Sequence, residues 1–188
     1  MADDAPRVIG SREGAVEFLG SIGARFLIDG EETGQRFALV EHPMPPRALA
    51  SPMHRHHRED EYSFVLEGQI GALLGESVVS GKPGDLIVKP RNQWHTFWNA
   101  GDAPARVLEV ISPAAFENFF RALAAELKAG APDPRRIAAH LGPLRGRDGP
   151  RQRAEPRRAL RRAVCGHVAE AGLRAQMGSG AAFLAGSS

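Results

Sequence analysis

Short apolar runs alternate with turn residues between residues 25 and 112. Runs such as RFLI, YSFVLEG and ARVLEVISP are separated by Gly, Pro, Asn or Asp, and long helical periodicity is absent from this part of the sequence. Several brief strands at this spacing are typical of an all-β sandwich or barrel. The pattern therefore predicts a mainly β domain over residues 25–112, preceded by an N-terminal extension over residues 1–24.

The period changes at residues 113–130, where we expect one helix. Ser112 is a candidate N-cap, Pro113 suits the first helical position, and Gly130 suits the end of the helix. Apolar residues recur there at steps of three and four positions, at Phe116, Phe119, Phe120, Leu123 and Leu127. We expect this apolar face to pack on the β domain rather than to contact a ligand.

Residues 131–188 differ in composition, being rich in Arg, Ala, Gly and Pro. The formal net charge of +2 hides an acidic body over residues 1–130 and a basic tail after it. The tail has few apolar residues to bury, so we expect it to be flexible. An Arg-rich RNA-binding arm and an extension without function both stay open. Nucleic acid is not the expected partner, because aromatic residues for base stacking are not interleaved with the arginines.

The number of cysteines and the length of the apolar runs indicate the cellular compartment in which the protein resides. The single cysteine, Cys165, excludes an internal disulfide and gives no sign of a secreted, cross-linked scaffold. The first residues, MADDAPRVIG, lack the basic start and apolar stretch of a signal peptide. No apolar run has the length needed to span a bilayer. We therefore expect a cytoplasmic protein without a membrane partner.

Histidines and carboxylates concentrate in the segment PMHRHHREDEYSFVLEG, residues 52–68. His54 and His56 share one face of an extended segment, because residues i and i+2 of a strand point to the same side. Glu61 follows after a short loop and shares a strand face with Ser63. Two imidazoles and a carboxylate that converge from a short span form part of a coordination shell for a divalent metal.

A further histidine lies in the segment GDLIVKPRNQWHTFWN, residues 84–99. The segment predicts a strand, a turn and a second strand that carries His95. Asn92 lies in the turn and can adopt the left-handed conformation that such a turn requires. If this hairpin lies against the strand that bears the histidine pair, His95 reaches the same interior point.

Together, the two segments resemble the two motifs of the cupin superfamily. The first motif is Gly, five residues, His-x-His, three or four residues, Glu, six residues, Gly. The second is Gly, five residues, Pro-x-Gly, two residues, His, three residues, Asn. The matching positions are His54, His56, Glu61 and Gly68 for the first motif and Gly84, Pro90, His95 and Asn99 for the second. Ala48 and Asn92 stand where the motifs have glycine, which concerns turn geometry rather than ligands.

The resemblance implies a jelly-roll β-barrel over residues 25–112, followed by the helix and the basic tail. It also implies a divalent metal in the wider mouth of the barrel, with iron, manganese or nickel expected before zinc or copper. The implied ligands are His54, His56, Glu61 and His95. Three imidazoles and one carboxylate leave open positions on the ion. Such a site suits an enolate or phenolate oxygen, and Glu61 is a candidate for a second, catalytic role as a base.

Strand parity also predicts which neighbours line a substrate pocket. Ser63 shares the face of Glu61, whereas Phe97 and Asn99 share the face of His95, so we expect these three near the metal. Trp94 and Trp98 have the opposite parity, and we expect them on the outer wall, for packing or a dimer contact.

Other residues offer no rival chemistry. His42 is interpreted as an ordinary histidine at the end of a strand. The sequence contains no Gly-x-Ser-x-Gly elbow and no phosphate-cradling Gly-rich loop. Cys165 also lacks a catalytic setting. The metal is therefore the one chemical resource that the sequence indicates.

Three functions remain open at this stage. The first is a metal-dependent enzyme that resembles the quercetin-dioxygenase-like cupins and acts on a small, aromatic molecule. The second uses the metal as a Lewis acid for isomerisation, cyclisation or decarboxylation. The third is a non-catalytic cupin that senses a small ligand, although residues 131–188 lack a convincing helix-turn-helix. For all three we expect a homodimer.

Overall fold

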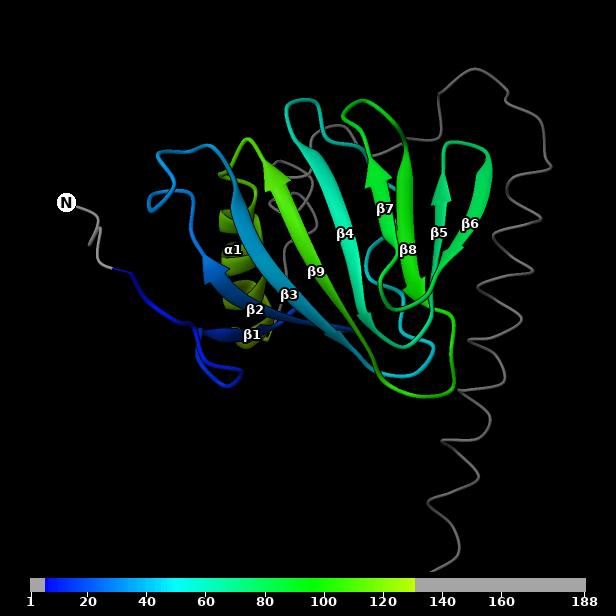
Figure 1. Cartoon of the computed structure of the whole chain (residues 1–188), viewed down its shortest axis with the longest axis horizontal. Coiled ribbons are helices and arrows are strands. Elements are labelled where there is room, and N and C mark those ends of the chain that lie inside the picture. The colour runs from blue at the N-terminus through cyan, green and yellow to red at the C-terminus, as the bar shows by residue number, and fades with distance from the viewer. Residues whose placement is uncertain (1–5, 131–188) are drawn as a thin grey trace, which may run out of the picture. The chain divides into compact units, whose positions relative to one another are not determined.

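The structure, a computed structural model, describes residues 6–130 (Figure 1). The basic tail predicted for residues 131–188 lies outside these residues. Within the described part, no helix is long and apolar enough to span a membrane. The elements in this part are β1 (Val16–Phe18), β2 (Gly23–Ile28), β3 (Ala38–Met44), β4 (Asp60–Glu67), β5 (Ile70–Leu74), β6 (Ser77–Gly81), β7 (Leu86–Lys89), β8 (His95–Asn99), β9 (Ala105–Ser112) and α1 (Glu117–Lys128).

The strands form two antiparallel sheets (Figure 1). The larger sheet has the order β1-β2-β3-β9-β4-β7, and the smaller has the order β6-β5-β8. Continuous strand pairing does not close the sheets into a barrel. The predicted mainly β jelly roll is nevertheless confirmed, because the two sheets share one apolar core. That core consists of Ile22, Met44, Val65, Ile70, Ala72, Ile87, Phe97, Ala105 and Val107.

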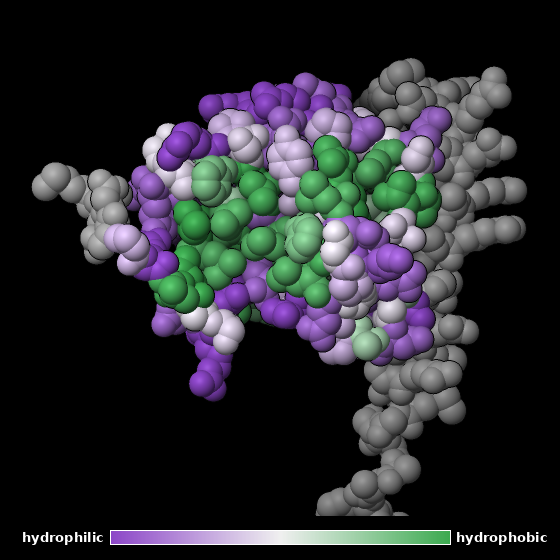
Figure 2. Space-filling model, viewed as in Figure 1, coloured by the Kyte–Doolittle hydropathy of each residue, from purple (hydrophilic) through white to green (hydrophobic). Residues whose placement is uncertain are grey.

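Burial along β4 and β9 follows the predicted alternation. On β4, Glu61, Ser63 and Val65 are buried, whereas Phe64 is exposed. Phe64 pairs with Leu86 of β7, which is also exposed, so apolar side chains cover part of the outer face of the larger sheet. Figure 2 shows apolar surface gathered on the face over these strands. The inner face of the same strands carries the buried polar side chains Glu61, Ser63 and Lys89.

The larger sheet begins before residue 25. β1 and the start of β2 lie within the residues predicted as an N-terminal extension, and Phe18 of β1 pairs with Gly23 of β2. This part of the chain is the edge strand of the larger sheet. Gly23 is required there, because a Cβ at this position would come within 2.7 Å of the ring of Pro43.

The helix starts later than the sequence predicted. Ser112 is the last residue of β9, where it pairs with Asp60, and its hydroxyl donates to the carbonyl of Arg36. Strand pairing therefore holds the predicted N-cap in an extended conformation, and α1 begins at Glu117 instead. The predicted end is confirmed, since Gly130 follows the helix with a φ of 84°.

Trp98 is buried outside the two core clusters, which agrees with packing on the outer wall and not with an exposed dimer contact. Its indole packs flat over Gly71 of β5, where an added Cβ would lie 2.4 Å from the ring. The bridge between Leu49 and Trp98 adds cover from the preceding loop. The neighbouring glycine and the overlying loop supply the packing partners, which strand parity does not identify.

One buried carboxylate joins three strands of the larger sheet. Glu41 of β3 accepts hydrogen bonds from Arg25 of β2 at 2.5 Å and from Arg106 of β9 at 3.1 Å. Burial by itself would raise the pKa of Glu41, but the two arginines outweigh it and lower that pKa below 4.5. A carboxyl group with a lowered folded-state pKa stabilises the fold only while it is ionised.

Replacing Glu41 by Gln should therefore destabilise the protein in a pH-dependent way. The stabilisation from Glu41 is fully present above the unfolded-state pKa and is lost as the pH falls through the lower folded-state pKa. We expect the variant to lose about 2 kcal/mol at pH 7 and progressively less below about pH 4.5. Urea unfolding across this range measures the difference, with the exposed Glu76→Gln as control. A loss that does not change with pH would contradict the prediction.

Candidate metal centre

Four buried side chains converge on one point between the sheets. His54, His56, Glu61 and His95 each offer one ligand atom, and these atoms lie within 4.8 Å of one another. The Nε2 atoms of His56 and His95 each lie 3.2 Å from an oxygen of Glu61, and the Nε2 atoms of His54 and His56 are 3.1 Å apart. The structure thus brings together the four residues that the two motifs indicated.

Backbone pairing brings the two distant segments together. His54 and His95 form an antiparallel bridge, in which each N–H donates to the carbonyl of the other at 3.0 and 2.8 Å. Asn92 has the predicted left-handed conformation, with a φ of 64°, and its N–H donates to the carbonyl of His56 at 2.6 Å. The turn before His95 is therefore tied directly to the histidine pair.

Hydrogen bonds to the outer ring nitrogens orient two of the imidazoles. Nδ1 of His54 lies 2.8 Å from the carbonyl of Pro52, and Nδ1 of His95 lies 3.0 Å from that of Gln93. Because a carbonyl only accepts, each Nδ1 carries the proton and each Nε2 presents a lone pair to the cluster. Burial, and then the neighbouring His95, lowers the pKa of His54 to about 3, which keeps that ring neutral.

The cluster has the properties that a divalent cation requires. Nε2 of His95 is buried and makes no hydrogen bond of acceptable geometry within the described residues, although Glu61 lies nearby. A buried polar atom without a partner is rare, and here it faces two further imidazoles and a carboxylate. Imidazole and carboxylate donors suit iron, manganese, nickel, zinc and copper. The four residues therefore fit a divalent metal.

A buried lysine is the main feature that the sequence reasoning missed. Nζ of Lys89 lies 2.9 Å from Glu61 and 2.8 Å from Glu109, and Lys89 is 1% exposed. Burial alone would lower the pKa of Lys89, but the two carboxylates outweigh it and raise that pKa. Strand alternation could have revealed that Lys89 and Glu109 point inward. Lys89 shares the inward parity of Ile87, and Glu109 shares that of Val107.

Lys89 also determines the charge state of Glu61. Burial alone would raise the pKa of Glu61, but Lys89 and His56 hold it well below its ordinary value. Register explains the contact, because Glu61 and Lys89 stand opposite each other on β4 and β7. Glu61 is therefore ionised, and its Oε2 is shared with an ammonium group.

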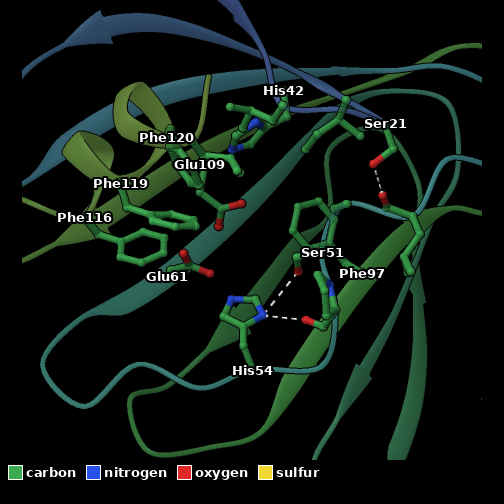
Figure 3. A pocket seen from close by; sticks show the side chains of 16 residues that line it. Ser21, His42, Ser51, His54, Glu61, Phe97, Glu109, Phe116, Phe119 and Phe120 are labelled. Carbon is green, nitrogen blue, oxygen red and sulfur yellow. Dashed lines mark hydrogen bonds between the residues drawn. The ribbon is translucent and has the colours of Figure 1, made fainter. Parts of the chain in front are cut away.

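A cavity of about 460 Å³ opens beside the cluster (Figure 3). His54 and Glu61 reach its wall from the cluster, whereas His42 and Glu109 line it elsewhere. Most of the remaining wall is apolar and comes from the turn between β1 and β2, the loop before the histidine pair, β8, and the segment that includes the first half of α1. Its apolar residues are Leu19, Ile22, Leu49, Ala50, Phe97, Phe116, Phe119, Phe120 and Leu123.

The three residues predicted to line a pocket have different positions. Phe97 lies on the cavity wall. Ser63 lies outside the wall, and its hydroxyl donates to Glu109 at 3.0 Å. Asn99 also lies outside it, because its side-chain amide is used by the backbone and donates to the carbonyls of Pro45 and Ala103.

The helix has a larger part in the site than the sequence suggested. Phe116 and Phe119 face the cavity as well as the core, and the ring of Phe116 stands edge-on to His56 with centroids 4.1 Å apart. His42, interpreted from the sequence as an ordinary strand-end histidine, also lies on the cavity wall. Period-three and period-four spacing identified the apolar helix face, but it did not indicate that a cavity lies beneath it.

Comparisons with known proteins agree with this architecture. Residues 41–111 match the family model for the cupin domain. A search of curated proteins finds no significant match. Among solved structures, the chain is similar to KdgF from a Halomonas species, with 17% identity and a TM-score of 0.53, over 61% of this chain and 99% of that one.

Two further solved structures have a similar fold. One is described as a predicted oxalate decarboxylase from Thermotoga maritima, with 22% identity and a TM-score of 0.53, over 57% of this chain and 99% of that one. The other is an RmlC-like cupin from Shewanella frigidimarina, with 16% identity and a TM-score of 0.51, over 61% and 96%. Identities of this size show a shared fold and not a shared reaction.

The four-residue cluster predicts that the protein, purified without a histidine tag, carries stoichiometric divalent metal. Replacing His56 by Ala should weaken metal binding by at least about 100-fold, because the variant loses an inner ligand, and even outer partners of ligands contribute 10- to 100-fold. Elemental analysis and competition with a chelator measure this. His57→Ala is the matched control, since His57 is exposed and contacts Asn92 instead. Metal retained in the His56 variant, or absent from the parent, would contradict the prediction.

Replacing Lys89 by Met should have opposite effects on stability and on metal affinity. The metal-free protein should lose about 3 kcal/mol of unfolding free energy, because two buried carboxylates lose their cation. Metal affinity should rise at least about tenfold, because a positive charge beside Glu61 is removed. Denaturant unfolding and chelator competition measure the two effects, with the exposed Lys82→Met as control. Weaker metal binding would instead show that Lys89 is needed to place Glu61.

Proposed function

We propose that this protein, whose residues 41–111 match the family model for the cupin domain, is a metal-dependent enzyme of the cupin superfamily. Its substrate is a small, largely apolar molecule that presents an enolate- or phenolate-type oxygen. One observation carries the proposal: the four-residue cluster opens, through His54 and Glu61, onto an apolar cavity of about 460 Å³. A concave apolar site with a few convergent polar groups is the usual form of a small-molecule site.

Electrostatics support an anionic oxygen at the cluster. The imidazole of His54 is neutral, and the negative charge of Glu61 is offset by Lys89. A divalent ion held by the four side chains would supply Lewis acidity and, for a redox-active metal, electron transfer toward O₂. An oxygen anion entering from the cavity would then meet net positive charge in surroundings of low polarity, where Coulomb attraction is strong.

The cavity wall supports an aromatic or similarly flat substrate. Phe116 and Phe119 lie with centroids 5.2 Å apart and an interplanar angle of 29°, and Phe97 lines the same cavity from β8. Aromatic rings in a wall favour offset-stacked or edge-on contact with another ring. The same wall offers water few hydrogen-bond partners beside the cluster, which would favour a reactive enolate over its protonation by solvent.

The environment of Glu61 favours the role of ligand over that of base. A carboxylate whose pKa is held well below its ordinary value has little tendency to take up a proton near neutral pH. Its Oε2 already forms an ion pair with Lys89, and its Oε1 faces His56. We therefore propose Glu61 as a metal ligand first, with proton transfer as a secondary role.

We propose a dioxygenase-like reaction first and a Lewis-acid reaction second. The second candidate, an isomerisation, cyclisation or decarboxylation, is supported by Lys89, because its ammonium withdraws negative charge from Glu61 and would leave a bound ion more electrophilic. We also propose a homodimer, which the exposed apolar side chains of Phe64, Leu86 and Val88 support.

A test of the reaction combines metal analysis with turnover. With iron, manganese, nickel or copper bound, we expect O₂ uptake, measured with an oxygen electrode, in step with loss of a flavonol or 1,3-diketone substrate. His54→Ala should reduce this rate at least about 100-fold, whereas His57→Ala should not. Bound zinc with turnover that needs no O₂ would favour the Lewis-acid reaction. Tight ligand binding without turnover would overturn the enzyme proposal in favour of a sensor.

A further inference from the structure

A polar row crosses the inner face of the larger sheet and ends away from the candidate metal centre. On adjacent strands, Glu61 stands opposite Lys89, and Ser63 stands opposite Glu109. His42 of β3 stands opposite Val107 of β9, so Glu109, two residues further along β9, is its diagonal neighbour on the same face. Figure 3 shows His42 and Glu109 beside the cavity, with His54 at its other end.

The ring of His42 is held in one orientation. Its Nδ1 lies 2.9 Å from the carbonyl of Gly23, and since a carbonyl only accepts, Nδ1 carries the ring proton. Phe120 stands edge-on to the ring at 5.2 Å with an interplanar angle of 89°. His42 is 2% exposed and burial lowers its pKa, so the ring is neutral. Its Nε2 is therefore a fixed acceptor.

The neighbouring carboxylate also has accepting capacity left. Oε1 of Glu109 forms an ion pair with Lys89 at 2.8 Å and accepts from Ser63 at 3.0 Å, whereas Oε2 has only Ser63, at 3.3 Å. Nε2 of His42 has no hydrogen-bond partner within residues 6–130. Both side chains line the cavity. Two acceptors therefore meet an otherwise apolar cavity, where a donor group on a ligand can form a hydrogen bond with them.

We propose that His42, assisted by Glu109, binds a hydroxyl group of the substrate at the end of the cavity remote from the candidate metal centre. The ligand class is then an apolar, aromatic-sized molecule with a hydroxyl donor. A cation is not selected, because Lys89 already neutralises much of the charge on Glu109. The inference rests on the proposed function only in treating this cavity as the substrate site.

The test uses two probes of nearly equal shape, 2-naphthol and 2-methylnaphthalene, which differ in a hydroxyl and a methyl group. Their dissociation constants are measured by fluorescence or calorimetry for the full chain, with and without bound metal. The preference for 2-naphthol over 2-methylnaphthalene should fall about three- to tenfold in His42→Phe, the range expected for one hydrogen bond. It should stay within about twofold of the parent's value in the matched control His57→Phe, which changes an exposed histidine that does not line the cavity.

A conservative variant and a spectrum guard against a folding defect in His42→Phe. His42→Gln keeps an acceptor oxygen and should retain part of the preference. In the parent protein labelled with ¹⁵N-histidine, the unprotonated Nε2 of His42 should shift upfield with 2-naphthol and not with 2-methylnaphthalene. An unchanged preference in His42→Phe, no shift, or no binding of either probe would overturn the inference. Loss of metal with the preference intact would overturn the proposed function alone.

Discussion

The polar inner face of the larger sheet depends on the buried ion pairs that Lys89 forms with Glu61 and Glu109. Two carboxylates on adjacent strands of a buried sheet face would repel each other and lose hydration. One ammonium at 2.9 and 2.8 Å offsets both negative charges and, against the effect of burial, holds the pKa of Glu61 well below its ordinary value. As a result the inner face carries a row of charge while the cavity wall around it stays apolar. Glu61 then remains available, as an anion, to the three imidazoles.

The second constraint is the pairing of a loop with a strand. The segment before β4 has little regular structure of its own, yet the bridge between His54 and His95 attaches it to β8. Orientation of the rings follows from the nearby carbonyls of Pro52 and Gln93. The site is thus built mainly from backbone contacts, which hold the imidazoles in place whether or not a cation is present. Such preorganisation lowers the cost of binding.

α1 closes the cavity as well as covering the core. Its phenylalanines belong to the apolar cluster with Phe26 and Val40, and they also line the cavity. Phe116 contacts the ring of His56, so the helix reaches the edge of the candidate metal centre. A change in the packing of α1 would therefore alter both the stability of the sheet and the space available to a substrate. The phenylalanines of this helix segment therefore form part of the cavity wall and part of the apolar core at the same time.

Features that depend on neighbours along the chain could be predicted from the sequence alone. Alternation identified the strands and the inward face of β4, and motif spacing identified the four residues of the cluster, because period and turn chemistry act over a few residues. Only the tertiary structure decided which distant strands meet. The register of β3, β9, β4 and β7 brings His42, Glu109 and Lys89 to one face, strand pairing keeps Ser112 out of the helix, and Gly71 makes room for Trp98. These contacts join residues far apart in sequence, so no local pattern records them.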